Sequence, residues 1–159
     1  RPFNTFGPRQ SSRAVIPTII TQLASNQRKL KLGSLTPLRD FNYVLDTCSA
    51  FIELAISNKS IGKVFNSSSG MEISIGDIAS LISELMGVKV DIFSEEQRFR
   101  PEKSEVNRLL GDNSFLKNET NWEPKFAGKV GLKLALNETI EWFRNKNNLS
   151  LYKISDFQL

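Results

Sequence analysis

The chain begins Arg1-Pro2-Phe3-Asn4-Thr5-Phe6-Gly7-Pro8-Arg9-Gln10. The apolar Phe3, the amide of Asn4 and the Gly7-Pro8 pair predict a strand that ends in a tight turn. Arginines flank this corner on both sides, and guanidinium groups pair well with anionic oxygens. The stretch therefore predicts an anion site where a strand runs into a loop. A strand this close to residue 1, without an initiator methionine, also leads us to expect part of a longer protein.

Downstream of this corner, short apolar strands alternate with amphipathic helices. Apolar spacing predicts strands near residues 30–33, 41–44, 63–66 and 88–93, and helices near 16–26, 46–56, 74–87 and 129–146. A further short helix is predicted to be capped by Asp112 or Asn113. Asp46 is predicted to cap the second helix, Ser74 and Asp77 have capping-box spacing, and Gly87 closes the third helix. This alternation is typical of an α/β fold.

Composition narrows the class of protein. The 159 residues suit one domain or most of one, and the net charge of +4 is spread along the chain. A nucleic-acid surface would need clustered basic residues, so we expect no nucleic-acid partner, although a solvated surface with no partner at all fits the charge equally well. Cys48 is the one cysteine, and the sequence contains neither a membrane-length apolar run nor a signal peptide. We expect a soluble cytoplasmic protein without membrane contact.

Several common catalytic groups are absent from the sequence. There is no histidine, which excludes a Ser-His-Asp triad within this chain and, with one cysteine, argues against a zinc site. No Gly-x-Gly-x-x-Gly or Walker loop occurs, and the pair Gly128 and Gly131 lacks a preceding strand and a third glycine. The sequence predicts no catalytic, metal-binding or cofactor-binding residue of its own.

Arginines in predicted loops remain as candidates: Arg9, Arg39, Arg100 and Arg108. Loops at the carboxyl ends of strands collect ligands in α/β proteins, and arginine pairs bidentately with phosphate. A shared phosphate site and ordinary surface arginines both remain open on spacing alone.

An ordered set of motifs carries a family resemblance. The segments are residues 1–9, Arg39-Asp40-Phe41-Asn42-Tyr43-Val44 with Asp46, Asn66, Arg100-Pro101, Leu110-Gly111-Asp112 and Asn121-Trp122-Glu123-Pro124. Over roughly residues 1–146 they resemble extended short-chain dehydrogenase/reductases of the NAD-dependent nucleotide-sugar epimerase/dehydratase family. Residues 12–21, 32–37 and 100–106 are most similar to nucleotide-sugar 4,6-dehydratases of the legionaminic-acid type.

The resemblance implies a fold, and it implies that substrate binding and NAD binding lie in different halves of a longer protein. Residues 1–146 would form the carboxyl-terminal, substrate-binding portion of a Rossmann-like NAD(P)-binding fold, with 147–159 as a tail. The family needs a glycine-rich turn for NAD and a Tyr-x-x-x-Lys pair, but Thr47 follows Tyr43 and Asp156 follows Tyr152 at that spacing. We therefore expect an N-terminal NAD-binding half upstream as partner, with this chain alone inactive and a poor binder of NAD.

The resemblance also assigns substrate-binding roles to residues Asn4, Ala14, Val15, Pro17, Arg39, Arg100 and Arg108. Asn4 would bond the diphosphate or sugar, Arg39 and Arg100 would approach the phosphates, and residues 14–17 would border the base. Arg108 is a further contact, and Arg9 is interpreted as a brace of the corner. For every polar residue, stabilisation of its own loop is the alternative.

The implied reaction is that of an NAD-dependent dehydratase. NAD would take a hydride from sugar C4, water would leave across C5–C6, and the hydride would return to C6 of a UDP- or related N-acetylhexosamine. A 4-epimerase, a decarboxylase, or a non-catalytic nucleotide-diphosphate binding module remain alternatives. An apolar face left uncovered by the missing half would make a homo-oligomer an additional expectation.

Overall fold

The computed structural model describes residues 1–25, 27, 29–99 and 104–152. Its elements are β1 (Asn4–Phe6), α1 (Val15–Ala24), β2 (Lys29–Leu32), β3 (Leu38–Tyr43), α2 (Val44–Ile56), η1 (Asn58–Ser60), β4 (Glu72–Ser74), α3 (Ile75–Met86), β5 (Asp91–Ser94), η2 (Glu96–Arg98), β6 (Arg108–Leu109), α4 (Ser114–Glu119), α5 (Gly128–Arg144) and α6 (Lys146–Leu149). Helices alternate with strands that pair in parallel, which confirms the predicted α/β class.

Strand β3 organises the larger sheet. Its second half pairs in parallel with β1, where Asn4 lies opposite Phe41. Its first half pairs with β4 in antiparallel and with β6 in parallel orientation, while β2 and β5 form a separate parallel pair. Side chains alternate between the two faces of a strand. Arg39 and Phe41 therefore share one face of β3, and Asp40 and Asn42 share the other.

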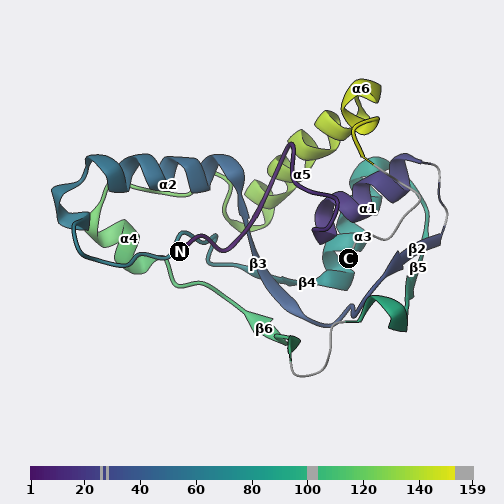
Figure 1. Ribbon diagram of the computed structural model, residues 1–159, viewed down its shortest axis with the longest axis horizontal. Helices are drawn as coiled ribbons and strands as arrows, with labels where there is room; N and C mark the ends of the chain where they lie inside the picture. Colours follow the sequence, from purple (N-terminus) through teal and green to yellow (C-terminus); the bar gives the residue numbers. More distant parts are fainter. Residues whose placement is uncertain (26, 28, 100–103, 153–159) are drawn as a thin grey trace.

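The main hydrophobic core lies among α1, α3 and α5, which gather on one side of β3 (Figure 1). The helical faces predicted from apolar spacing meet there, and the predicted inward residues of α5 are all buried: Leu132, Leu136, Ile140 and Phe143. Each fully buried apolar side chain of this size contributes roughly 1.5–3 kcal/mol. The core thus fixes α1 against the sheet and with it the segment that precedes α1.

A smaller cluster lies between α2 and α4, away from the main core (Figure 1). Trp122 is its largest member, and Ala50, Phe65 and Leu116 complete it. The Trp122 Nε1 donates to the Asp46 carbonyl at 3.1 Å, which places the Asn121-Trp122-Glu123-Pro124 segment against the start of α2.

Two local predictions were wrong. Helix α2 begins at Val44, so Asp46 lies inside its first turn and instead accepts hydrogen bonds from the Lys125 and Phe126 amides, both at 2.9 Å. Residues 63–66 form no strand. The Phe65 carbonyl accepts a hydrogen bond from the Arg1 amino group at 2.7 Å, and the neighbouring Ser67 makes an isolated bridge with Pro2. Both errors concern contacts between segments far apart in sequence.

Asp40 fastens two loops beneath β3. Its fully buried carboxylate accepts hydrogen bonds from the Ser69 amide (2.9 Å) and hydroxyl (2.7 Å), and from the amides of Gly70 and Gly111 (both 3.1 Å). A Cβ on Gly111 would lie 2.4 Å from the Ser68 Cβ, so only glycine permits this approach. The face of β3 opposite Arg39 is therefore a structural anchor.

The described part of the predicted tail packs against α5. The Tyr152 ring lies 5.0 Å from that of Phe143, centroid to centroid, and burial raises the pKa of Tyr152 above its ordinary value. Residues 153–159 lie outside the described residues. Within the described ranges, no helix combines the length and the apolar character needed to cross a membrane.

Candidate functional site

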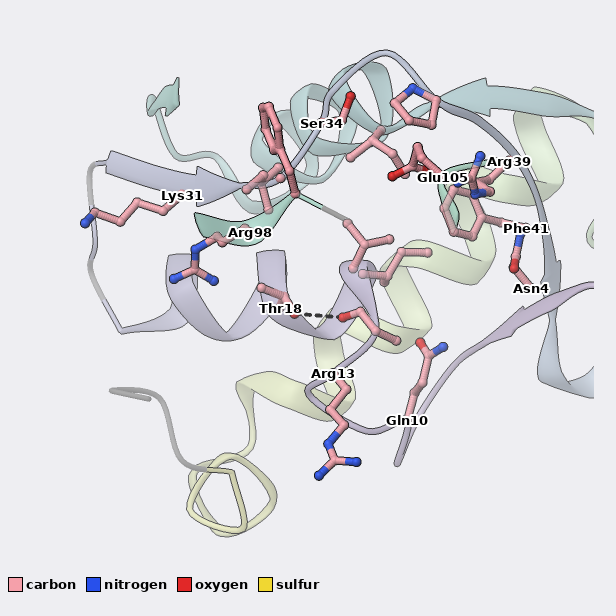
Figure 2. A pocket seen from close by; sticks show the side chains of 18 of the residues that line it. Asn4, Gln10, Arg13, Thr18, Lys31, Ser34, Arg39, Phe41, Arg98 and Glu105 are labelled. Carbon is pink, nitrogen blue, oxygen red and sulfur yellow. Dashed lines mark hydrogen bonds and ion pairs between the residues drawn. The ribbon is translucent and has the colours of Figure 1, made fainter. Parts of the chain in front are cut away.

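A cavity of about 680 Å³ lies between β1, the N-terminal part of β3, the start of α1 and the end of β2 (Figure 2). Its lining residues used below are Asn4, Gln10, Arg13, Ala14, Val15, Thr18, Lys31, Arg39, Phe41, Arg98 and Glu105. The volume falls within the roughly 300–1,000 Å³ usual for small-molecule sites.

The corner after β1 delivers one wall of the cavity. Gly7 has φ 152°, and a Cβ there would lie 2.6 Å from Val44 Cγ1, so glycine is required for the chain to turn against α2. Gln10 then ties the turn back to β1, since its Nε2 donates to the Thr5 carbonyl at 2.7 Å. This arrangement brings Ala14, the N-cap of α1, to the cavity.

The start of α1 favours an anion. Ala14 has no side-chain cap, and the amides of a first helical turn carry partial positive charge. The Thr18 hydroxyl donates back to the Ala14 carbonyl at 2.8 Å, which steadies this turn.

Arg39 lies within β3 and not in a loop, contrary to the prediction, because Leu38–Asp40 pair with β4. Its Nη2 donates to Glu105 Oε1 at 2.7 Å and its Nη1 donates to the Leu38 carbonyl at 2.9 Å. The side chains of Arg39 and Glu105 are only 12% and 20% exposed. The guanidinium is thus held beside the cavity in one orientation (Figure 2).

The charge of the described lining is mainly positive. Arg13, Lys31, Arg39 and Arg98 line the cavity, against the single carboxylate of Glu105. Outside the lining, Glu95 bonds both Lys31 and Arg98 at 2.8 Å, and these two bonds lower the pKa of the Glu95 carboxyl. The cavity therefore suits an anionic ligand.

The structure brings four of the predicted ligand residues together, since Asn4, Ala14, Val15 and Arg39 all line the cavity. Pro17 does not line it, because it is buried within α1.

The remaining predicted arginines lie elsewhere. Arg108 sits on β6 away from the cavity, and its Nε donates to Glu72 Oε2 at 2.7 Å, a bond that raises the pKa of Arg108. Arg100 lies outside the described residues. Arg9 has φ 67°, and its exposed side chain makes no hydrogen bond or ion pair with described residues, so the predicted brace is not seen.

Sequence reasoning missed Gln10, Arg13 and Glu105 as cavity residues. Gln10 and Arg13 lie between a strand end and a helix start, which is the signal that could have found them. Two buried polar atoms at the cavity have no hydrogen-bond partner: Asn4 Nδ2, a donor, and Gln10 Oε1, an acceptor. Buried polar groups are normally paired, so both atoms are candidates for ligand contact.

Neither tyrosine of the described chain is placed for proton transfer in this cavity. The Tyr43 hydroxyl donates to Glu138 Oε2 at 2.6 Å, and burial together with that carboxylate raises the pKa of Tyr43 well above its ordinary value. A general base works best with a pKa near the working pH. Tyr152 packs against α5, outside the cavity lining.

Gly131 lies near the start of α5, in the glycine pair considered above for phosphate binding. A Cβ on Gly131 would lie 2.3 Å from the Phe126 carbonyl carbon, so Gly131 serves close packing at the start of α5 and not a phosphate cradle. No group of three or more carboxylate or cysteine side chains among the described residues could hold a metal ion.

Comparison with known proteins gives this cavity a family context. The GDP-mannose 4,6 dehydratase family model matches residues 1–134. A GDP-6-deoxy-D-mannose reductase from Pseudomonas aeruginosa is 31% identical over 87% of the chain, and the dTDP-D-glucose 4,6-dehydratase of Homo sapiens is 30% identical over 91%. A solved structure, RMD from Pseudomonas aeruginosa complexed with NADPH, superposes with a TM-score of 0.79 at 26% identity over 92% of the chain.

The chain spans about half or less of each of these proteins: 46% of the reductase, 40% of the dehydratase and 48% of the solved chain. The superposition places the α/β fold among Rossmann-like NAD-dependent epimerase/dehydratase structures, as the resemblance predicted. Because the family model matches most of its length, this chain belongs to the GDP-mannose 4,6 dehydratase family.

Proposed function

We propose that this chain is the nucleotide-sugar-binding portion of an NAD-dependent nucleotide-sugar 4,6-dehydratase. The substrate would be a UDP- or related N-acetylhexosamine, and the product its 4-keto-6-deoxy sugar. The observation that carries the proposal is the cationic cavity in which Asn4, Arg39 and the start of α1 converge. Family membership supports it, because relatives include a dTDP-D-glucose 4,6-dehydratase.

In this proposal each wall of the cavity holds a different part of the ligand. Arg39 pairs with a phosphate, Asn4 Nδ2 donates to a diphosphate or sugar oxygen, and Ala14 and Val15 border the base. Arg100 stays a predicted diphosphate ligand. We assign no ligand contact to Pro17 or Arg108, since neither lines the cavity.

Catalytic groups and the NAD site are proposed to lie in residues outside this chain. A structural relative, of which this chain covers 48%, is complexed with NADPH, and Gly131 packs against the Phe126 backbone. NAD, when bound by the whole protein, supplies the hydride chemistry. This chain supplies binding and orientation of the nucleotide sugar, and we expect it to be inactive by itself.

An exposed apolar face of α2 supports a partner half. Leu45, Phe51, Ile52 and Ile56 are 53%, 51%, 62% and 72% exposed, an unusual concentration on one helix. We propose that the NAD-binding half of the same protein covers this face, because relatives carry at least as much further chain.

The reactivity of Cys48 can test whether the NAD-binding half covers α2, because Cys48 is exposed on the same helix. We expect Cys48 to react quickly with a thiol reagent in the isolated chain and slowly in the whole protein, with peptide mass spectrometry locating the label. Equal reactivity in both would show that the NAD-binding half does not cover α2. Protection of the isolated chain that rises with concentration would instead indicate a homo-oligomer.

The reaction is tested with the whole protein, NAD and a panel of nucleotide-linked N-acetylhexosamines. A product one water lighter, with a 4-keto-6-deoxy sugar by NMR, is the expected result. Preference among the sugars would also test the legionaminic-acid-type assignment. A 4-epimer, or a product that has lost carbon dioxide, would overturn the dehydratase while keeping the family.

Two other outcomes have specific support. Relatives include a UDP-glucuronic acid decarboxylase at 31% identity and a UDP-glucose 4-epimerase structure complexed with UDP-glucose. A cavity that holds only the ligand, without the reacting groups, serves any of these reactions. A non-catalytic binding module is the remaining alternative, and micromolar calorimetric binding of a nucleotide sugar by the isolated chain, with no turnover by the whole protein, would favour it.

A further inference from the structure

Gly33, the residue that follows β2, lies against the backbone of η2. A Cβ on Gly33 would stand 2.6 Å from the carbonyl oxygen of Arg98, a separation that these two atoms cannot adopt. The three heavy atoms nearest to that Cβ all belong to Arg98, so a side chain on this residue would be directed at η2. Glycine is therefore required for η2 to pack this closely against the end of β2.

Polar contacts join the same two segments. The Glu95 amide donates to the last carbonyl of β2 at 2.8 Å, and the Ser94 hydroxyl donates to the Gly33 carbonyl at 3.0 Å. The Glu95 carboxylate forms ion pairs with Lys31 on β2 and Arg98 on η2, both at 2.8 Å. We call these contacts and the approach of Gly33 to η2 the β2–η2 clasp.

The two segments that the clasp joins are held very differently by the rest of the fold. Leu30 and Leu32 of β2 are buried in the main core. By contrast, η2 contains no buried residue. Few buried contacts make a segment easy to displace. The position of η2 therefore depends on the clasp, which transfers to it the fixed position of β2.

The segment that the clasp holds forms one wall of the cavity. Gln97, Arg98 and Phe99 all line the cavity, and Figure 2 shows Arg98 among the lining side chains. Asn4 and Arg39 line it from β1 and β3. A displacement of η2 would therefore move one wall relative to the strands that carry the proposed phosphate ligands.

We propose that Gly33 is a positioning residue of the nucleotide-sugar site, which sets the distance of the η2 wall from the ligand. This inference rests on the proposed function. An added methyl group would force η2 away from β2, because it would meet a backbone carbonyl group and not a side chain that can rotate away. A ligand that spans the cavity would then lose contacts with the displaced wall while it kept those made by Asn4 and Arg39.

The test compares Gly33→Ala with Gly76→Ala in the whole protein by calorimetry. The unaltered protein is titrated with GDP, dTDP and UDP, and the variants with the diphosphate that binds most tightly and with its N-acetylhexosamine conjugate. We expect Gly33→Ala to weaken binding of the conjugate about 2- to 10-fold, the effect of losing about one hydrogen bond. Gly76→Ala should keep full affinity, because its Cβ would lie 3.5 Å from the Leu35 carbonyl oxygen, an ordinary contact. If the unaltered protein binds none of the ligands, it is the proposed function that fails.

A second substitution tests how Gly33 acts. Glu95→Gln weakens the clasp without adding volume, and it should also lower affinity for the conjugate about 2- to 10-fold. The double variant of Gly33→Ala and Glu95→Gln should lose less than the product of the two single effects, because both substitutions release the same segment. Gly33→Ala combined with Arg39→Ala should give the full product, because Arg39 is held by β3 and not by η2.

Two results would overturn the positioning role. One is unchanged affinity for the conjugate in a Gly33→Ala protein that is folded by circular dichroism. The other is a full product of the single effects when Gly33→Ala is combined with Glu95→Gln. If Gly33→Ala does not fold, Glu95→Gln decides alone, and unchanged affinity in that variant would refute the inference.

Discussion

The substitution Asp40→Asn tests whether the buried carboxylate of Asp40 anchors the two loops that lie against β3. The carboxylate is fully buried and accepts four hydrogen bonds of 2.7–3.1 Å. Oδ1 serves the Ser69 amide and hydroxyl, and Oδ2 serves the amides of Gly70 and Gly111. Asparagine has the same shape but must turn an N–H₂ group toward one of these pairs.

The less costly orientation can be worked out from the contacts. With the N–H₂ group in place of Oδ1, the Ser69 hydroxyl can accept from it and donate instead to the Met71 carbonyl, 3.3 Å away. The Ser69 amide is then left facing a donor, and the two bonds at Oδ2 lose the help of the negative charge. One orphaned buried donor and two weakened charge-assisted bonds together amount to about 2–4 kcal/mol.

The measurement is native-state hydrogen exchange in the whole protein. We expect protection of the Gly70 and Gly111 amides to fall roughly 30- to 700-fold, which is the same free energy expressed as a ratio. Asp77→Asn is the matched control, because its exposed carboxylate accepts from the Ser74 hydroxyl at 2.6 Å and contributes under about 1 kcal/mol. A loss below about 1 kcal/mol in Asp40→Asn would refute the anchoring role.

The remaining predictions concern binding and pH. Arg39→Ala should weaken nucleotide-sugar binding roughly 10- to 100-fold, for the loss of a charge-assisted bond of about 1.5–3 kcal/mol, and unchanged calorimetric affinity would make Arg39 a loop brace. The raised pKa of Tyr43 means that the unfolded tyrosine ionises first, near pH 10, so stability should fall above that pH; Tyr43→Phe should flatten the fall in urea unfolding curves. Because the fold lowers the pKa of Glu95, its ionised carboxylate stabilises the folded state above the ordinary glutamate pKa of about 4.3. This stabilisation is lost as the pH falls further, so melting curves of Glu95→Gln should show less acid sensitivity than those of the unaltered protein.

Local patterns in the sequence predicted the helices well, and for a clear reason. The apolar spacing in α3 and α5, the Ser74 cap and the left-handed Gly87 at φ 69° are all properties of neighbouring residues. The Asp46 prediction failed because that carboxylate bonds the Lys125 and Phe126 amides, almost eighty positions away in the chain. Capping propensity cannot distinguish such a long-range partner from a local one.

The residues of the candidate site also separate into those that the sequence identified and those that only the structure revealed. Asn4 and Arg39 were found through a resemblance, because their motifs stand out in the chain. Glu105 was missed because nothing in the sequence shows that it meets Arg39 across 66 residues. Gln10 was missed because a polar residue in a turn is ordinary, and only the fixed amide and the buried, unpaired oxygen mark it as unusual.

Strand β3 explains why binding and stability should separate residue by residue. Arg39 and Phe41 line the cavity, while Asp40 and Asn42 turn to the opposite face, where Asp40 holds the loops of residues 67–70 and 110–112. Arg39→Ala should therefore lower affinity with little change in amide protection at Gly111, and Asp40→Asn should do the reverse. If both neighbours changed both properties equally, the two faces would not be independent, and the anchor would have to be counted as part of the ligand site.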